Sequence, residues 1–347
     1  MASNAMAAGE LYFAGELDPR TQELTSYFKI GIVRESEDRS SVNRMKEHQT
    51  GNPRELTLIE TIPTPVVEQI ETLMHGAFAP LRISGEWFFF SSEQRDQAIR
   101  QATEYALEAN DSIMHMKRAI ELEKVPSNDG ALTPSDRAWE LHLRLLNIRH
   151  EIKVLENATK LIDATIRDLS SSDVPLGRYA TLGSSTESEK FDETKFKQDH
   201  PDLWSQLYEI TPKWQQRFLL SETKEMKESL GETRSEIREI TDAVKSQIQR
   251  AIDFRDIAPV HGEFLNVLTF LAPLEWEEKR LESELKAELG EYQEIEGICS
   301  WTRSFKDRGS LNKKVLQELH PEIYGKYVSK SQSKPKLTIS RDCGFVH

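Results

Sequence analysis

Residues 10–33 read ELYFAGELDPRTQELTSYFKIGIV, and this stretch decides the fold of the first part of the chain. Two runs enriched in aromatic and β-branched side chains, 10–14 and 24–33, lie on either side of the turn-forming residues 17–20. Such runs, separated by a turn that contains proline, are typical of paired antiparallel strands. The stretch therefore predicts a β-hairpin.

The residues that follow the hairpin predict the rest of one small domain. Alternating apolar residues indicate strands at 56–62 and 85–90, and helices are expected at about 37–48 and 65–78. The resulting order is β-β-α-β-α-β. This order predicts a compact α+β unit, a small mixed sheet with flanking helices, over residues 8–95.

After this unit the apolar period changes from two to about 3.5. Residues 91–94 (SSEQ) form a capping box that opens a long helix, and residues 96–299 are predicted to be a long-helix, coiled-coil-like region with a flexible loop at about 170–190. Three heptad-like seams lie in it: Ala138, Leu141, Leu145, Ile148, Ile152, Leu155, Thr159, Ile162, Ile166 and Leu169; then Met226, Leu230, Thr233, Ile237, Ile240, Val244, Gln247, Ala251 and Phe254; then Leu281, Leu285, Leu289, Tyr292 and Ile295. These seams can be buried on one another within the chain or on those of a second copy, and both the intramolecular bundle and the homodimer remain open.

Composition limits the class of protein. The chain has 347 residues, two cysteines and no apolar run near the roughly 20 residues that cross a bilayer. A disulfide framework is therefore excluded, and a reducing, cytoplasmic location without membrane contact is expected. Residues 1–5 resemble an expression scar.

The net charge of −13 is unevenly distributed. Residues 1–95 hold 9 basic and 14 acidic side chains, whereas residues 300–347 hold 10 basic and 4 acidic ones. We predict that 300–347 is a basic helical segment and tail. If the chain binds a polyanion, clustered cations here would supply the phosphate contacts. The candidates are Arg303, Lys306, Arg308, Lys313 and Lys314. The alternative is a solvated tail.

A faint internal repeat relates two helical segments. Residues 196–204 (FKQDHPDLW) and 316–324 (LQELHPEIY) share the pattern His-Pro-acid-aliphatic-aromatic, with proline suited to a helix start. The simplest interpretation is two similar helical caps with an aromatic anchor, and the alternative is a functional role for His200 and His320.

The first domain also carries side chains suited to phosphodiester hydrolysis, which needs an activated nucleophile, a cation on the phosphate and help for the leaving group. Arg44 and His48 are four residues apart and share a helix face, so Arg44 can present a fork to a phosphate oxygen. Glu71 offers a hard oxygen ligand for Mg²⁺, and Tyr12 can relay a proton from the attacking water.

Five short motifs follow one another in this domain: YFKIG at 27–31, R-x-x-x-H at 44–48, QTGNP at 49–53, E-x-x-x-H at 71–75 and GEWF at 85–88. In this order and spacing they resemble the GIY-YIG nuclease superfamily, in particular its phage and bacterial branch with a Y-K-I-G strand. The resemblance is confined to residues 8–95.

The resemblance implies a metal-dependent endonuclease that acts on DNA with Mg²⁺ or Mn²⁺. It assigns catalytic roles to Tyr12 and Arg44 and a metal-binding role to Glu71, and we expect Lys29 and His48 to join them. Supporting roles are considered for Tyr27, His75, Arg82 and Glu86.

Two departures from the superfamily pattern bear on activity. Lys29 stands where the superfamily has its second signature tyrosine, and its late asparagine has no counterpart, with Glu86 lying near that place. The main hypothesis, which follows from the resemblance, is a metal-dependent DNA endonuclease in phage defence, mobile-element maintenance or repair. The alternative is a coiled-coil scaffold whose degenerate nuclease head binds nucleic acid or protein without cutting.

Overall fold

A computed structural model describes residues 6–36, 40–50, 54–223 and 233–344. The segments 1–5, 37–39, 51–53, 224–232 and 345–347 are outside the described residues, and with them the predicted scar, the start of the first helix, the end of the QTGNP motif and part of the second seam.

The N-terminal domain, called the head below, contains the predicted small sheet with flanking helices. All of its strand pairs are antiparallel, so the sheet is not mixed as predicted, and the strand order is β3-β1-β2-β5-β4. The observed order along the chain matches the predicted one, with the short β4 added. The elements are β1 (Gly9–Leu17), β2 (Leu24–Arg34), α1 (Ser41–Gln49), β3 (Leu56–Thr64), α2 (Val67–Ala77), the 3₁₀ turn η1 (Ala79–Leu81), β4 (Arg82–Ser84) and β5 (Trp87–Phe89).

The two faces of this sheet are covered differently. Side chains alternate along a strand, so Leu11 and Phe13 pack under α2 and α3 (Ser92–Leu122), whereas Tyr12 and Ala14 face α1. The head core does not stop at residue 95, because four buried alanines of α3 complete it. The predicted capping box opens α3, with Ser91 and Gln94 bonding to each other's backbone.

The rest of the core is a helical bundle around α9 (Ala258–Leu289), which packs against α2, α3, α4 (Asp136–Ser171) and α8 (Ser235–Phe254). The predicted seam of α4 is buried in the same core as α8 and α9. Of the two alternatives, the intramolecular bundle is therefore the one that this seam forms. We call α3, α4, α8 and α9 the body. Within the part of the chain that the structure describes, no helix is both long and apolar enough to cross a membrane.

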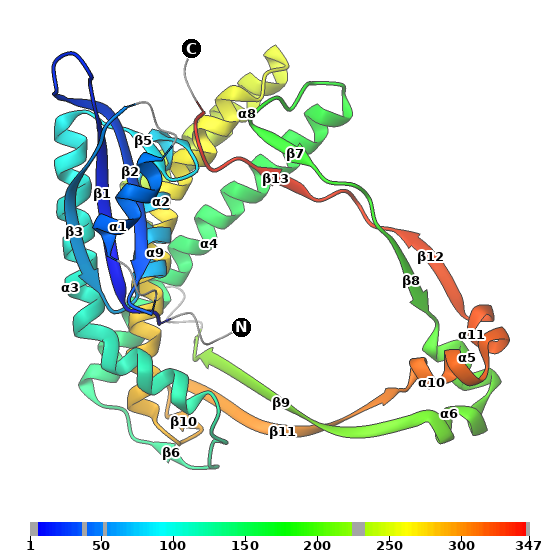
Figure 1. The fold of residues 1–347 in the computed structure, drawn as a ribbon. Coiled ribbons are helices and arrows are strands. Elements are labelled where there is room, and N and C mark those ends of the chain that lie inside the picture. Colours follow the sequence, from blue (N-terminus) through cyan, green and yellow to red (C-terminus); the bar gives the residue numbers. More distant parts are fainter. Residues whose placement is uncertain (1–5, 37–39, 51–53, 224–232, 345–347) are drawn as a thin grey trace.

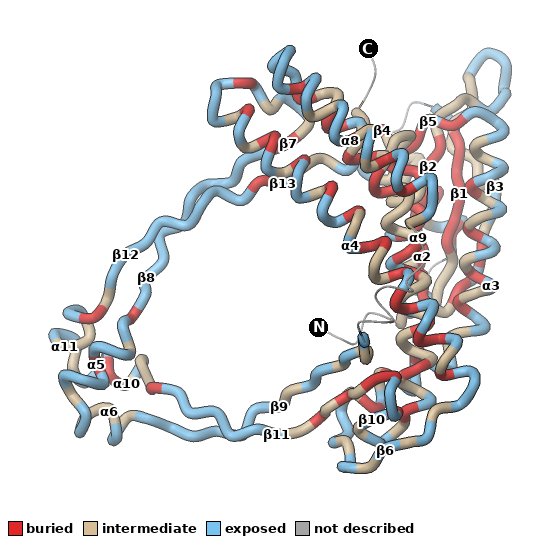
Figure 2. Tube along the Cα trace, turned by 180° about the vertical axis from the view of Figure 1, so that it is seen from behind, coloured by how far each residue is buried: buried red, intermediate tan, exposed pale blue. Residues whose placement is uncertain are grey.

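Two long ribbons leave opposite ends of the body and meet in four short helices, so that the chain closes a wide loop (Figures 1 and 2). We call the ribbons and these helices the arm. One ribbon pairs β9 (Tyr208–Leu220) with β11 (Cys299–Leu311), and the other pairs β8 (Glu187–Phe191) with β12 (Val328–Gln332). The remaining short strands are β6 (Ala131–Leu132), β7 (Ala180–Leu182), β10 (Glu294–Ile295) and β13 (Leu337–Ile339).

The arm corrects three predictions. Residues 208–220, inside the predicted long-helix region 96–299, form the strand β9. The segment 300–347 is not one helical unit, because residues 299–311 form a strand and two further strands follow the short helices. The expected loop at 170–190 contains β7 and most of β8, which pair with β13 and β12. In each place the partner strand is far away in sequence, so local composition carried no sign of it.

The internal repeat is confirmed as a structural duplication. Each copy runs strand-helix-helix-strand, with helices α5 (Glu193–Asp199) and α6 (Pro201–Leu207) in one and α10 (Lys313–Leu319) and α11 (Pro321–Lys326) in the other. His200 and His320 sit between the paired helices with nearly the same backbone angles, φ −135° and ψ 61° against φ −136° and ψ 57°. Aromatic and aliphatic side chains from both copies share one small core, which agrees with the interpretation as anchored caps.

We predict opposite effects of the same substitution at two helical glycines. A Cβ on Gly76 of α2 would lie 2.5 Å from the Cβ of Ala272 on α9, whereas a Cβ on Gly262 of α9 would meet nothing within 4 Å. Gly76→Ala should destabilise the protein by about 1–3 kcal/mol through overpacking, and Gly262→Ala should stabilise it by about 0.5–1 kcal/mol. Thermal melts of both variants test this, and a Gly76→Ala melt at or above that of the parent would show that α2 and α9 are not in close contact.

Candidate functional site

The candidate site is built around Tyr12, which is almost fully buried in β1. In the β1–β2 register Tyr12 lies opposite Gly31, and a Cβ on Gly31 would be only 2.5 Å from the Tyr12 hydroxyl oxygen. The glycine therefore leaves the space in which the tyrosine ring lies. This role was missed in the sequence, although a glycine inside a strand is a recognised sign of close approach.

Helix α1 brings two of the predicted residues to the Tyr12 hydroxyl. His48 Nε2 lies 3.2 Å from the hydroxyl oxygen, and the Arg44 side chain is within hydrogen-bonding reach of it. Burial and the neighbouring charge of Glu86 raise the pKa of Tyr12 far above its usual value, whereas burial and Lys29 lower the pKa of His48. At neutral pH the pair is therefore a protonated phenol beside a neutral imidazole.

Lys29 of β2 and Glu86 of the β4–β5 turn form an ion pair at the site. Lys29 is buried, and Ile30 N–H also donates to the Glu86 carbonyl, which fixes the turn against β2. Burial alone would raise the pKa of Glu86, but the hydrogen bond and charge of Lys29 outweigh it and lower the pKa overall. Glu86 is therefore a carboxylate held next to the tyrosine.

Glu71 of α2 is the second acid of the site. Burial and the like charge of Glu86 raise its pKa to about 7, and the positive charges of Lys29, Arg34 and Arg82 partly offset this rise. Among the described residues no hydrogen bond or ion pair involves its carboxyl group. Glu71 also influences the pKa of Tyr12, so the predicted tyrosine, arginine and glutamate lie within electrostatic reach of one another.

The supporting residues divide into two groups. Burial and the charge of Arg82 lower the pKa of His75 to about 4, and its Nε2 lies 3.2 Å from the carbonyl oxygen of Ile30, which ties α2 to β2. Arg82 is half-buried and donates from Nε to the Gly85 carbonyl at 2.5 Å. Tyr27 does not join the cluster, because its ring packs against Phe89.

Sequence reasoning missed two residues whose charges reach this cluster. Arg34, at the end of β2, lowers the pKa of Glu71 and pairs with Glu68 of α2. Asp342 acts on the Arg82 guanidinium from the end of the chain, where Cys343 N–H donates to the Arg82 carbonyl at 2.7 Å. No local sequence signal marks Asp342, because it comes close to the head only when the chain folds.

The predicted nucleic-acid-binding cations lie in the arm, in unequal surroundings. Arg303 is fully buried, donates to the carbonyls of Leu122 and Gly290 and stacks on Trp301, so its assignment to phosphate contacts is wrong. Lys313 pairs with Glu193 at 2.7 Å. Exposed side chains are found at Lys306, Arg308 and Lys314.

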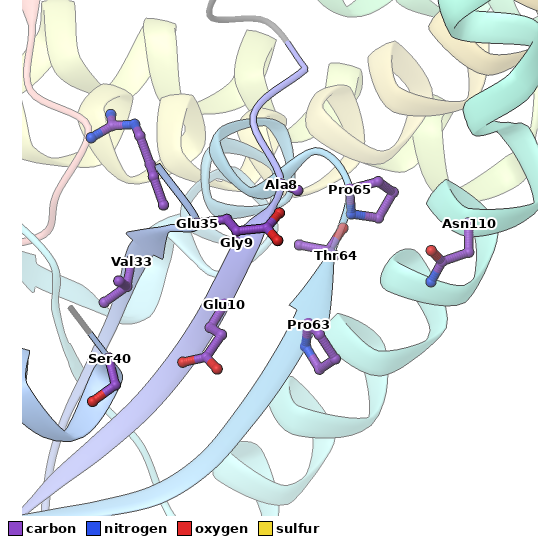
Figure 3. A pocket seen from close by; sticks show the side chains of 11 residues that line it. Ala8, Gly9, Glu10, Val33, Glu35, Ser40, Pro63, Thr64, Pro65 and Asn110 are labelled. Atoms are coloured by element: carbon purple, nitrogen blue, oxygen red, sulfur yellow. The ribbon is translucent and has the colours of Figure 1, made fainter. Parts of the chain in front are cut away.

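A cavity of about 590 Å³ opens at one end of the sheet, beside the first residues of β1 (Figure 3). It is lined by backbone and side chains of β1, β2, β3 and α3, including Glu10, Thr64 and Asn110. None of the five main predicted site residues lines it, but Arg34, whose charge lowers the pKa of Glu71, does.

The charge arrangement fits a divalent cation. The described residues hold no group of three or more His, Cys, Asp or Glu side chains placed to bind a metal ion. Mg²⁺ does not require one, since it is often held by one or two carboxylates and completes its octahedron with water and phosphate oxygens. The Glu71 carboxyl has no hydrogen-bond or ion-pair partner among the described residues, and the charge of Glu86 raises its pKa, so a cation near both acids would stabilise them.

The comparisons with known proteins address the same part of the chain. Residues 11–103 match the T5orf172 domain. The T5orf172 domain is a family linked to nuclease-associated domains. The match begins within β1 and ends inside α3, so it includes Tyr12, Lys29, Arg44, His48, Glu71 and Glu86. No curated protein and no solved structure matches the chain.

We predict that Glu71 makes stability fall as pH rises. The folded carboxyl has a pKa of about 7 against 4.5 for the free group. Between these pH values the folded state keeps a proton that the unfolded state has released, so the free energy of unfolding falls as the pH rises from 4.5 to 7. Glu71→Gln removes this penalty and should be more stable than the parent by about 1–3 kcal/mol above pH 7, with no gain below pH 4.5. Thermal melts in EDTA across this range measure the difference. The exposed Glu104→Gln of α3 is the control, and a pH-independent gain in Glu71→Gln would contradict the prediction.

Proposed function

We propose that the chain is a metal-dependent endonuclease that hydrolyses DNA phosphodiester bonds at the Tyr12–Arg44–Glu71 site with a GIY-YIG-like arrangement. The observation that carries the proposal is that side chains from four elements, β1, α1, α2 and the β4–β5 turn, lie close enough around the buried Tyr12 to shift one another's pKa values. The match to the T5orf172 domain supports it, because that match spans the same elements.

Glu71 and Glu86 would hold the cation, Mg²⁺ or Mn²⁺. When bound, the cation would polarise the phosphate and offset its charge. The ion would also offset the burial and the repulsion from Glu86 that together raise the pKa of Glu71. Lys29 then keeps Glu86 ionised and adds a positive charge beside the phosphate.

Arg44 would bind a non-bridging phosphate oxygen. Its guanidinium is paired with Glu47 at 2.7 Å on a partly exposed surface, and such pairs are worth only about 0–1 kcal/mol. The arginine can therefore exchange this partner for phosphate at little cost. A planar fork with fixed charge suits this role better than a lysine would.

The Tyr12–His48 pair would remove the proton of the attacking water. Tyr12 is protonated at neutral pH, so it cannot act as a phenolate base by itself. The neutral His48 can accept the hydroxyl proton of Tyr12 while Tyr12 accepts that of water, which leaves the charge on the imidazole. The relay ends on a group that is partly exposed to solvent.

Arg44→Ala and Glu71→Gln should each reduce nicking of supercoiled plasmid in Mg²⁺ by about 10²-fold or more, because each removes a charge that acts on the transition state. Arg100→Ala and Glu104→Gln, at exposed positions of α3, are the matched controls for charge. Variants that cut as well as the parent would refute the site. A parent protein that binds DNA but does not cut it with any divalent ion would favour the scaffold alternative.

The two histidines of the site should differ. His48→Gln removes the proton acceptor and should lower kcat by roughly 10²–10⁴-fold with little change in KM. His75→Gln keeps a side chain that can bond to the Ile30 carbonyl, so it should retain most of the activity. Steady-state kinetics on a short labelled duplex measure both, and equal losses would place the base elsewhere.

A further inference from the structure

The β9–β11 ribbon has two chemically different faces. Residues paired directly across two strands point to the same side, and alternate pairs point to opposite sides. One face carries the pairs Thr302–Arg217, Ser304–Gln215, Lys306–Lys213 and Arg308–Thr211. The other carries Phe305–Trp214 and Gly309–Ile210, with the two aromatic rings in an edge contact at 5.0 Å.

The first of these faces, which we call the basic face, has unpaired cations. Arg217, Lys213, Lys306 and Arg308 are all exposed, and none forms an ion pair with any carboxylate of the described chain. The pairs that carry them span seven residues of strand, which at six rises is about 20 Å. They form a row of positive charge along one side of the ribbon.

One pair on this face is unfavourable for the fold. Lys213 and Lys306 lie directly opposite each other, and like charges in such positions destabilise a ribbon. A two-stranded ribbon has little stability to spare. The side chains that separate the cations are small or polar, so the charges have no packing role on this face. Their arrangement suits a polyanion.

We propose that the basic face of the β9–β11 ribbon binds the phosphate backbone of duplex DNA and holds it for the head. Single-strand binders stack bases on aromatic side chains, and the ribbon's aromatic residues lie on the opposite face. A straight row of cations without rings fits a duplex backbone, and a two-stranded ribbon also fits the major groove. The choice of DNA as the polyanion rests on the function proposed above. The argument from charge, that this face binds a polyanion, does not depend on that function.

The head needs such a surface because it is itself acidic, with 9 basic and 14 acidic residues before position 96. A negative domain repels a polyanion at long range, so affinity must come from elsewhere in the chain. The β9–β11 ribbon is fixed at its base by Arg303, which donates to the carbonyl of Leu122 at the end of α3, and α3 also completes the core of the head. DNA on the ribbon is therefore bound by a part of the molecule that is tied to the site.

The test compares two triple variants of the full chain with the same change in charge. Lys213→Gln/Lys306→Gln/Arg308→Gln removes three cations of the basic face. Lys160→Gln/Lys245→Gln/Lys330→Gln removes three exposed lysines that each pair with an acid, at 3.8, 2.8 and 3.4 Å. Fluorescence anisotropy with a labelled duplex in EDTA measures binding without cleavage, over a series of KCl concentrations.

We expect the ribbon variant to bind duplex DNA about tenfold more weakly or worse, and the slope of log K against log salt to fall by about three units. The control variant should bind like the parent. The thermal melt of the ribbon variant should be no lower than that of the parent, since the like-charge pair is removed.

Equal losses in both triple variants, or an unchanged slope in the ribbon variant, would overturn the proposal. Tighter binding of the parent to a single strand of equal length would also overturn it. Ribbon-dependent binding by a chain that never nicks plasmid would support the ribbon and refute the nuclease, and nicking without ribbon-dependent binding would do the reverse.

Discussion

The buried surface of α9 is the constraint on which the rest of the structure depends. Its residues Val267, Leu274 and Leu285 belong to the bundle core, while Trp276 belongs to the core of the head and donates from Nε1 to Glu108 at 2.9 Å. Close approach of α2 to α9 requires Gly76. The helix that carries Glu71 and His75 is thus positioned by a helix nearly 200 residues later, which makes the body part of the site's support.

The arm illustrates a second constraint. An isolated two-stranded ribbon is marginal in water, and most residues of β9, β8 and β12 are exposed (Figure 2). Each ribbon is anchored in the body at one end and in the small aromatic core of the repeated caps at the other. The duplication explains how both anchors form together, since each copy gives one strand to each ribbon. This design leaves whole ribbon faces free for contacts that the fold itself does not need.

The head could be predicted in some detail because its signals are local. The hairpin around residues 17–20 and the capping box at Ser91 are each determined by neighbours within a few residues. The same holds for the spacing of Arg44 and His48 on α1. The ion pair of Lys29 with Glu86 and the place of Asp342 could not be predicted, because each depends on strands or segments that meet only after folding. Arg303 shows the same limit, since this basic residue in a basic segment is buried against carbonyls at the C-terminal ends of α3 and α9.

The sequence by itself determined the elements of the head apart from β4, the seam of α4 and the repeat of the His-Pro caps, because apolar periodicity and turn chemistry act over a few residues. It also gave the residues that we propose for phosphodiester chemistry. Only the tertiary structure decided that the seam is buried within the chain, that residues 299–311 are a strand, and that Glu71 has a raised pKa. Strand pairing across about 90 residues and the desolvation of a carboxyl are properties of the packed chain, and no local pattern encodes them.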